Sequence, residues 1–111
     1  MTLQRLTTTT LFAATAMWLT AAAAEDSVTI EIKDHRFQPA EVTVPAGQKV
    51  RLVVKNLDPT PEEFESLELR REKVIPGNSE GVVLIGPLEP GKYPFFGEFH
   101  EDTAKGMIIA K

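Results

Sequence analysis

The 111-residue sequence contains no cysteine. The chain therefore has no disulfide, no thiolate nucleophile and no thiolate ligand for a metal. Small exported domains often use disulfides to supplement a limited hydrophobic core. A domain of this size without them has to be held together by the burial of apolar side chains alone.

Positive charge is also in short supply. Twelve Lys and Arg residues stand against sixteen Asp and Glu residues, which gives a net charge of −4. Proteins that bind nucleic acids present a basic face to the phosphates, so we expect no nucleic-acid partner. A mildly acidic surface is compatible with binding cations, although many soluble domains share it.

Long apolar runs are absent except near the N-terminus. Residues 11–19 are apolar, follow a short polar stretch whose single charge is Arg5, and precede the small residues 21–24. This order is typical of a secretory signal, and the run is shorter than the roughly 20 residues of a transmembrane helix. We expect residues 1–24 to be a signal peptide, cleaved between Ala24 and Glu25, with an uncleaved anchor as the alternative. The mature chain, residues 25–111, then carries eleven basic and sixteen acidic residues, a net charge of −5.

The mature chain alternates between apolar and polar residues for most of its length. Val28, Ile30 and Ile32 alternate with polar residues, and similar short runs occur at 42–44, 50–54, 82–85 and 107–110. A further extended segment is expected around residues 64–69. Proline- and glycine-containing turns separate these runs at 45–47, 76–79 and 87–91. Short alternating strands with regular turns predict a single all-β domain, a sandwich or a barrel.

Two segments concentrate polar side chains at expected strand ends. Residues 62–66 contribute Glu63 and Glu65, and residues 97–102 contribute Glu98, His100 and Glu101. Carboxylates suit hard cations, and one imidazole adds affinity for iron, copper or zinc. The two segments together are therefore a candidate metal site.

Simpler interpretations remain open for each of these residues. Glu62 and Glu63 are compatible with solvated loop charges, and Glu98 with a surface ion pair to Lys92 or Arg70. His100 is compatible with an exposed loop histidine. The other histidine, His35, is interpreted as a turn residue, and four aromatic residues as part of the core: Tyr93, Phe95, Phe96 and Phe99.

Motifs of other enzyme classes are missing. Ser66 and Ser79 lack the flanking glycines of a nucleophile elbow, and no glycine-rich loop leads into a helix. The residues alone therefore favour neither hydrolysis nor nucleotide binding.

The mature chain resembles the cupredoxin superfamily along its whole length. The resemblance rests on Phe37-Gln38-Pro39, on Val44-Pro45-Ala46-Gly47 and on the run 50–56 that ends in Asn56, followed by 90–96 and 106–109. It implies a Greek-key β-sandwich.

The blue-copper ligands of that superfamily are incomplete here. The cysteine position falls on Gly97, the second histidine on His100, the first histidine within residues 62–63 and the methionine near Lys105. Without a thiolate we expect no type 1 blue-copper centre.

A narrower resemblance is to the EfeO-type cupredoxins associated with bacterial iron permeases. Glu63-Phe64-Glu65 and the run 96–106 carry it. It implies a periplasmic accessory protein that binds iron or copper for an inner-membrane iron permease and its companion proteins. The implied metal ligands are Glu63, Glu65, Glu98, His100 and Glu101, with Asp102 as a further candidate.

Strand alternation limits how these ligands can be arranged. If Phe64 faces the core, Glu63 and Glu65 point outward unless a bulge turns one of them.

Two other functions stay open: a copper-dependent ferroxidase, and a metal-free scaffold that binds a protein partner. We expect a binding protein rather than an enzyme.

Overall fold

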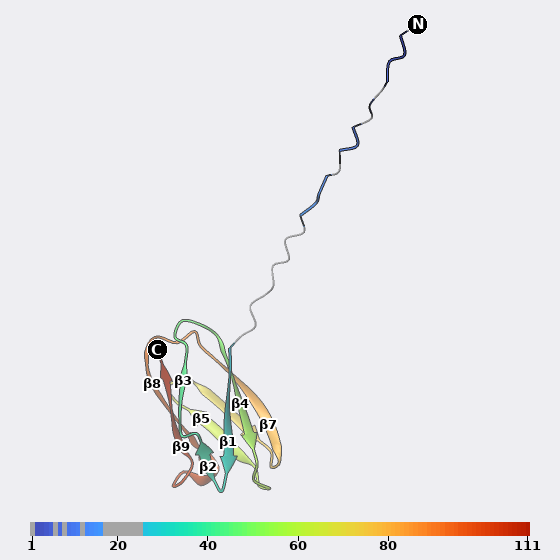
Figure 1. Ribbon diagram of the computed structural model, residues 1–111. Coiled ribbons are helices and arrows are strands. Elements are labelled where there is room, and N and C mark those ends of the chain that lie inside the picture. The colour runs from blue at the N-terminus through green and yellow to red at the C-terminus, as the bar shows by residue number, and fades with distance from the viewer. Residues whose placement is uncertain (1, 6, 8, 12, 17–25) are drawn as a thin grey trace.

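The computed structural model describes residues 2–5, 7, 9–11, 13–16 and 26–111, and residues 26–111 form two β-sheets packed face to face (Figure 1). The expected cleavage site between Ala24 and Glu25, with the small residues 21–24, lies outside the described residues. Within the described part, no helix has the length and apolarity needed to cross a membrane.

The first sheet has four strands in the order β2-β1-β4-β7. These are β1 (Asp26–Lys33), β2 (Arg36–Gln38), β4 (Val50–Asn56) and β7 (Ser79–Ile85). β1 runs parallel to β4, while the β1–β2 and β4–β7 pairs are antiparallel.

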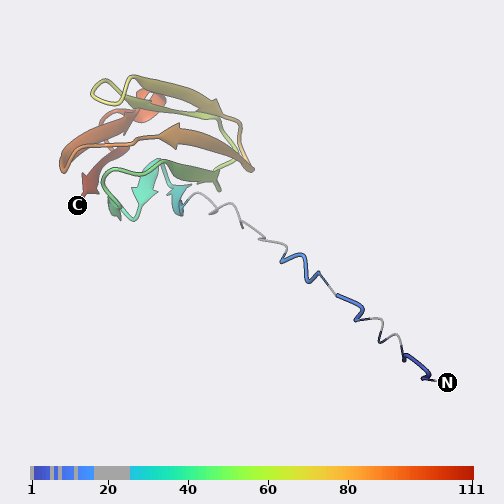
Figure 2. The same cartoon turned by 90° about the horizontal axis from the view of Figure 1, so that it is seen from above.

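The second sheet has five strands in the order β3-β9-β8-β5-β6. These are β3 (Glu41–Val44), β9 (Lys105–Ala110), β8 (Gly91–Gly97), β5 (Glu62–Ser66) and β6 (Arg71–Ile75). Figure 2 shows the two layers from above. The predicted all-β sandwich is confirmed.

Alternating side chains of both sheets fill the space between the layers. Ile30, Ile32 and Leu52 enter it from the first sheet, and Phe64 and Phe95 from the second, each at most 2% exposed. The ring of Phe37 meets the ring of Phe95 edge-on at 4.9 Å. Such T-shaped contacts add to the stabilisation from burial.

Two expectations about the middle and end of the chain are wrong. The segment expected to extend from 64 to 69 ends at Ser66, turns through Leu67, and returns as β6. β6 is an edge strand with four exposed residues out of five, so it carries no alternation from which to predict it. Phe99, expected in the core, is 48% exposed.

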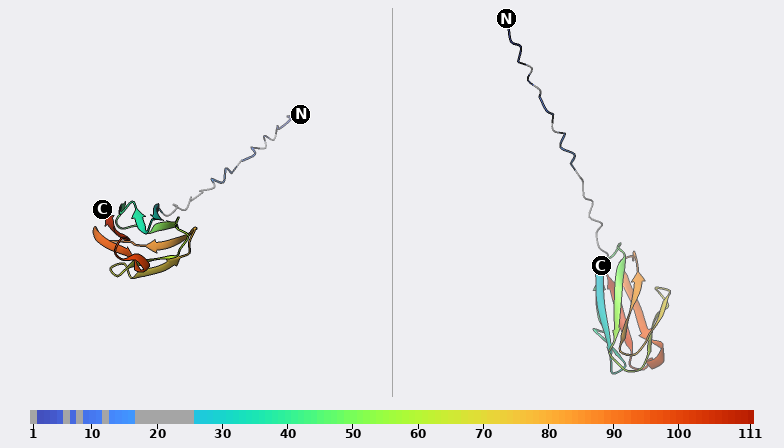
Figure 3. Two further views of the ribbon diagram at one scale, coloured as in Figure 1. Left: turned by 90° about the horizontal axis from the view of Figure 1, so that it is seen from below. Right: turned by 90° about the vertical axis from the view of Figure 1, so that its right-hand side faces the viewer.

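Three connections meet at one end of the sandwich. They are the turn between β1 and β2, the loop from β4 to β5, and the segment from η1 (Glu98–His100) to β9 (Figure 3). Hydrogen bonds join them: Asp58 accepts from the His35 N–H, and the Thr103 hydroxyl donates to the His35 carbonyl. The polar residues predicted as ligands lie at this end.

Candidate metal centre

Strand β5 presents acidic side chains on both of its faces. Phe64 is fully buried in the core, so Glu62 faces inward with it, while Glu63 and Glu65 lie on the outer face of the sheet. The expectation that Glu63 and Glu65 point away from the core is confirmed, and no bulge intervenes in their pairing with β6.

Four carboxylates gather on the outer face and are called here the acidic cluster: Glu63, Glu65, Glu72 and Glu98. Glu65 and Glu72 are directly opposite each other in the β5–β6 pair. Glu63, Glu65 and Glu72 each place a carboxylate oxygen within 4.8 Å of the others. Glu98, from η1, is near enough to raise the pKa of both Glu63 and Glu65.

Crowding of like charges changes how the acidic cluster titrates. A hydrogen bond with Glu98, then burial, then a hydrogen bond with Glu72 raise the pKa of Glu63 to about 7. Burial and a hydrogen bond with Glu98 raise the pKa of Glu65 as well. Protons therefore occupy part of this cluster near neutral pH, where isolated glutamates are fully ionised.

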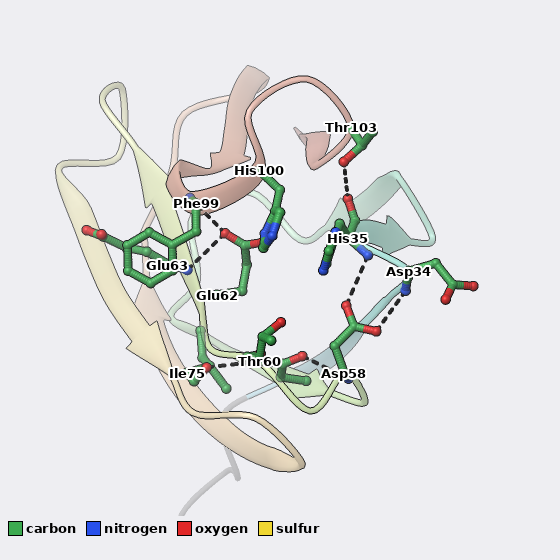
Figure 4. A network of polar contacts seen from close by, with 11 residues as sticks. Asp34, His35, Asp58, Thr60, Glu62, Glu63, Ile75, Phe99, His100 and Thr103 are labelled. Atoms are coloured by element: carbon green, nitrogen blue, oxygen red, sulfur yellow. Dashed lines mark hydrogen bonds and ion pairs between the residues drawn. The ribbon is translucent and has the colours of Figure 1, made fainter.

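No positive side chain neutralises the acidic cluster among the residues the structure describes. Glu63 is only 6% exposed, yet its carboxylate has neither a cationic partner nor an N–H donor there. In Figure 4 it points away from the neighbouring hydrogen-bond network. The alternative interpretation of Glu98, a surface ion pair with Lys92 or Arg70, is wrong, because neither pair is formed. No fully buried side-chain oxygen among the described residues lacks a hydrogen-bond partner, so the Glu63 carboxylate keeps contact with solvent and is open to a proton or a cation.

Glu62 lies on the inner side of β5 and is 1% exposed. Its Oε1 accepts the N–H groups of Phe99 at 3.0 Å and Glu63 at 3.1 Å, and its Oε2 lies 2.5 Å from His100 Nδ1 (Figure 4). The interpretation of Glu62 as a solvated loop charge is therefore wrong. A carboxylate that accepts two backbone N–H groups and an imidazole N–H can be buried without a large penalty.

His35 and His100 stack on each other at this end. Their ring centroids are 3.5 Å apart and the rings are tilted by 14°. His35 does lie in the β1–β2 turn, as interpreted from the sequence, but its imidazole packs against a histidine 65 positions later. Nothing in the spacing of two single histidines indicates such a contact.

The predicted ligand set is thus divided between two places. Glu63, Glu65 and Glu98 come together, joined by Glu72, which the sequence analysis missed because it missed β6. Glu101 and Asp102 are exposed, and Glu101 is near enough to raise the pKa of Glu65. His100 belongs instead with Glu62 and His35.

The type 1 copper site of the cupredoxin fold does not fit these residues. The expected cysteine position is Gly97, and a Cβ built there would lie 2.7 Å from the Glu62 carboxyl group and 2.7 Å from the Ala104 Cβ. The Glu62 carboxylate therefore fills the space that a side chain at 97 would need. The chain has no thiolate and no room for one at this position.

Comparison with known proteins places the chain in a family. The model of the Cupredoxin-like domain family matches residues 6–110. The protein belongs to the Cupredoxin-like domain family. This cupredoxin-like protein is 51% identical over 82 residues to Uncharacterized protein RP394 of Rickettsia prowazekii (strain Madrid E). That alignment covers 74% of this chain and 66% of the relative, so the chain spans just under two thirds of the relative's length.

Solved structures agree with the fold. The metal-binding domain of the Cu(I)-exporting P-type ATPase CopA of Streptococcus pneumoniae D39, with Cu(I), matches at a TM-score of 0.68 and 18% identity, covering 77% of this chain and 84% of that one. Auracyanin A, a "blue" copper protein of Chloroflexus aurantiacus, matches at a TM-score of 0.67 and 15% identity, covering 79% of this chain and 100% of that one. At these identities the likeness extends to the fold alone.

Proposed function

We propose that this cupredoxin-like protein binds a metal ion of the hard, oxygen-preferring kind through the acidic cluster, and that iron is the ion it carries. The proposal rests on one observation: carboxylate oxygens of Glu63, Glu65 and Glu72 lie within 4.8 Å of one another, and no cationic side chain pairs with them among the described residues. A bound cation would remove the repulsion that now keeps protons in the cluster.

The ligand atoms favour certain metals over others. Carboxylate oxygens suit iron, manganese, magnesium and calcium, whereas soft ions such as Cu(I) prefer sulfur ligands. Glu63 and Glu65 come from β5, Glu72 from β6 and Glu98 from η1, so the cluster needs the tertiary fold to exist. We therefore expect the folded chain to bind the metal and the unfolded chain to bind it far more weakly.

A cellular role follows from the sequence resemblance. We infer that the chain is exported, that it works in the bacterial periplasm, and that it passes iron to an inner-membrane iron permease. The N-terminal residues 1–24 and the Glu63-Phe64-Glu65 motif support this role. Copper binding by CopA and auracyanin A supports a metal-related role in general and does not identify the metal.

Calorimetric titration of the whole chain with Fe(II), without oxygen, and with Mn(II) tests the proposal. We expect one ion per chain. Glu65→Gln and Glu72→Gln should each lose affinity at least at the upper end of the roughly 10–100-fold that removal of an outer-shell partner costs. The exposed Glu41→Gln is the matched control and should bind as the unmodified chain does.

Two outcomes would favour the other functions. Equal binding by the cluster variants and Glu41→Gln, or no binding at all, would contradict the proposal and favour a scaffold for a protein partner. Oxygen consumption when Fe(II) and copper are both present would indicate a ferroxidase rather than a carrier.

A further inference from the structure

We propose that His35 and His100 form a second metal site, separate from the acidic cluster, which takes a borderline divalent cation such as Zn(II) or Cu(II) through imidazole nitrogens. This site does not depend on the proposed iron-carrying function. It lies on the other side of β5 from Glu63, and its donors are nitrogen rather than oxygen.

The orientation of His100 is the first argument. Oε1 of Glu62 accepts two backbone N–H groups, so Glu62 acts as an acceptor, and His100 Nδ1 donates to its Oε2 at 2.5 Å. In the neutral imidazole with its proton on Nδ1, Nε2 carries a free lone pair. A carboxylate that fixes the far nitrogen of an imidazole is the usual outer-shell arrangement of histidines that bind metals.

The placement of His35 is the second argument. Asp34 and His35 both adopt left-handed backbone conformations, with φ of 52° and 57°, as the two loop residues of a tight β1–β2 hairpin. Asp58 holds this turn by accepting the N–H groups of Asp34 at 2.8 Å and His35 at 3.0 Å. The Thr103 hydroxyl donates to the His35 carbonyl at 2.6 Å. Together these contacts hold the hairpin turn in the position that places the His35 ring against His100.

The surroundings of the pair are the third argument. The ring centroids are 3.5 Å apart and the rings are nearly parallel, so the two imidazoles lie next to each other, and binding a common ion requires the stacked rings to turn until their in-plane lone pairs converge. Both rings line a hollow of about 500 Å³ that also contains Glu101 and Asp102. Neither carboxylate lies within 4.8 Å of a nitrogen of both rings, so water would complete the coordination shell, since zinc and copper accept mixed nitrogen and oxygen ligands.

This site is not the type 1 copper site of the fold. His100 Nδ1 is engaged by Glu62, and the cysteine position is Gly97 with no space for a side chain. The nitrogen offered to a metal is Nε2, on the side of the ring away from Glu62. The metal would lie in the hollow and not between the sheets.

The test is a Zn(II) titration of the whole chain by calorimetry, with Cu(II) electron paramagnetic resonance as a second measurement. We expect one Zn(II) per chain and hyperfine structure from two imidazole nitrogens on Cu(II). His35→Asn is the sharpest variant, because asparagine tolerates the left-handed backbone of position 35. His35→Asn and His100→Gln should each weaken Zn(II) binding by more than about tenfold, and Glu62→Gln by about 10–100-fold. Glu72→Gln should leave it unchanged.

Three results would overturn the site. Zn(II) binding of His35→Asn and His100→Gln at the affinity of the unmodified chain would exclude the histidines as ligands. Loss of Zn(II) binding in Glu72→Gln instead would assign the ion to the acidic cluster. Should a histidine variant fail to fold, the imidazole resonances of the unmodified chain decide: without a Zn(II)-dependent shift of both His35 and His100, the proposal fails.

Discussion

Glu62 and Glu63 are consecutive residues of β5, and their carboxylates lie on opposite sides of the sheet. Glu62 faces inward and holds His100, whereas Glu63 faces outward and joins Glu65 and Glu72. The alternation of a β-strand thus separates two groups with different chemistry by a single residue. Glu62 is fully hydrogen-bonded, while Glu63 has no donor among the described residues.

Replacement of Glu62 should destabilise the fold. Glu62→Ala removes the acceptor of the Phe99 and Glu63 N–H groups and of His100 Nδ1. We expect the free energy of unfolding in urea to fall by about 2 kcal/mol or more, because buried donors are left without partners. Glu62→Gln, which keeps an acceptor oxygen, should lose less. Equal stability of Glu62→Ala and the unmodified chain would contradict the hydrogen bonding described above.

The metal-free protein should become less stable as the pH rises toward neutrality. The hydrogen bond with Glu98, together with burial, raises the pKa of Glu63 from 4.5 to about 7 on folding. Between pH 4.5 and 7 the folded chain binds more protons than the unfolded chain. The contribution of protonated Glu63 to the free energy of unfolding is therefore complete below pH 4.5 and is lost as the pH rises through 7. Urea unfolding at pH 5 and pH 8 measures it. Glu63→Gln should show a smaller difference between the two pH values, and an unchanged difference would count against the raised pKa.

Gly97 should not tolerate a side chain. The Cβ of Gly97→Ala would lie 2.7 Å from both the Glu62 carboxyl group and the Ala104 Cβ. We expect a loss of about 1–3 kcal/mol in the free energy of unfolding, the usual result of overpacking. Gly91→Ala in the same strand is the control, because its nearest neighbour is 3.8 Å away. Gly97→Cys should likewise be destabilised and should not produce an intense blue colour with Cu(II). A stable, blue Gly97→Cys protein would show that Glu62 can give way.

Asp58 should stabilise the β1–β2 turn at neutral pH and not in acid. Burial raises the pKa of Asp58, but hydrogen bonds from the His35 and Asp34 N–H groups outweigh burial and hold it below its ordinary value of 3.8. Its contribution is therefore present above about pH 4 and is lost as the pH falls through the lowered pKa. Asp58→Asn should be less stable than the unmodified chain at pH 7, by roughly 1–2 kcal/mol for a weakened charged hydrogen bond. The difference in stability between Asp58→Asn and the unmodified chain should narrow in acid. A difference that stays constant with pH would contradict the lowered pKa of Asp58.

The sandwich and the orientation of β5 could be predicted from the sequence because both depend on local alternation. Val28, Ile30 and Ile32 mark one buried face, and Phe64 determines which side of β5 Glu63 occupies. β6 could not be predicted in this way. Its residues are mostly charged, and it is held in the sheet by pairing with β5 rather than by a buried face.

Glu62 shows why a residue type alone is an unreliable guide to exposure. A glutamate beside a proline-containing loop usually is solvated, and only the nearby N–H groups of Glu63 and Phe99 and the ring of His100 make its burial possible. The prediction for Phe99 was wrong for a related reason. An aromatic side chain is expected in the core, but Phe99 lies in η1, where its side chain is exposed.

By itself the sequence determined the fold class, the outward direction of Glu63 and Glu65, and the lack of any thiolate for copper. The resemblance already grouped Glu98 with these two residues. Only the tertiary structure decided that Glu72 joins them, and that His35 stacks on His100. Alternation along a strand is a property of neighbouring residues and can be read from the chain. The distance between residues far apart in sequence depends on strand register and on how three connections close at one end of the sandwich.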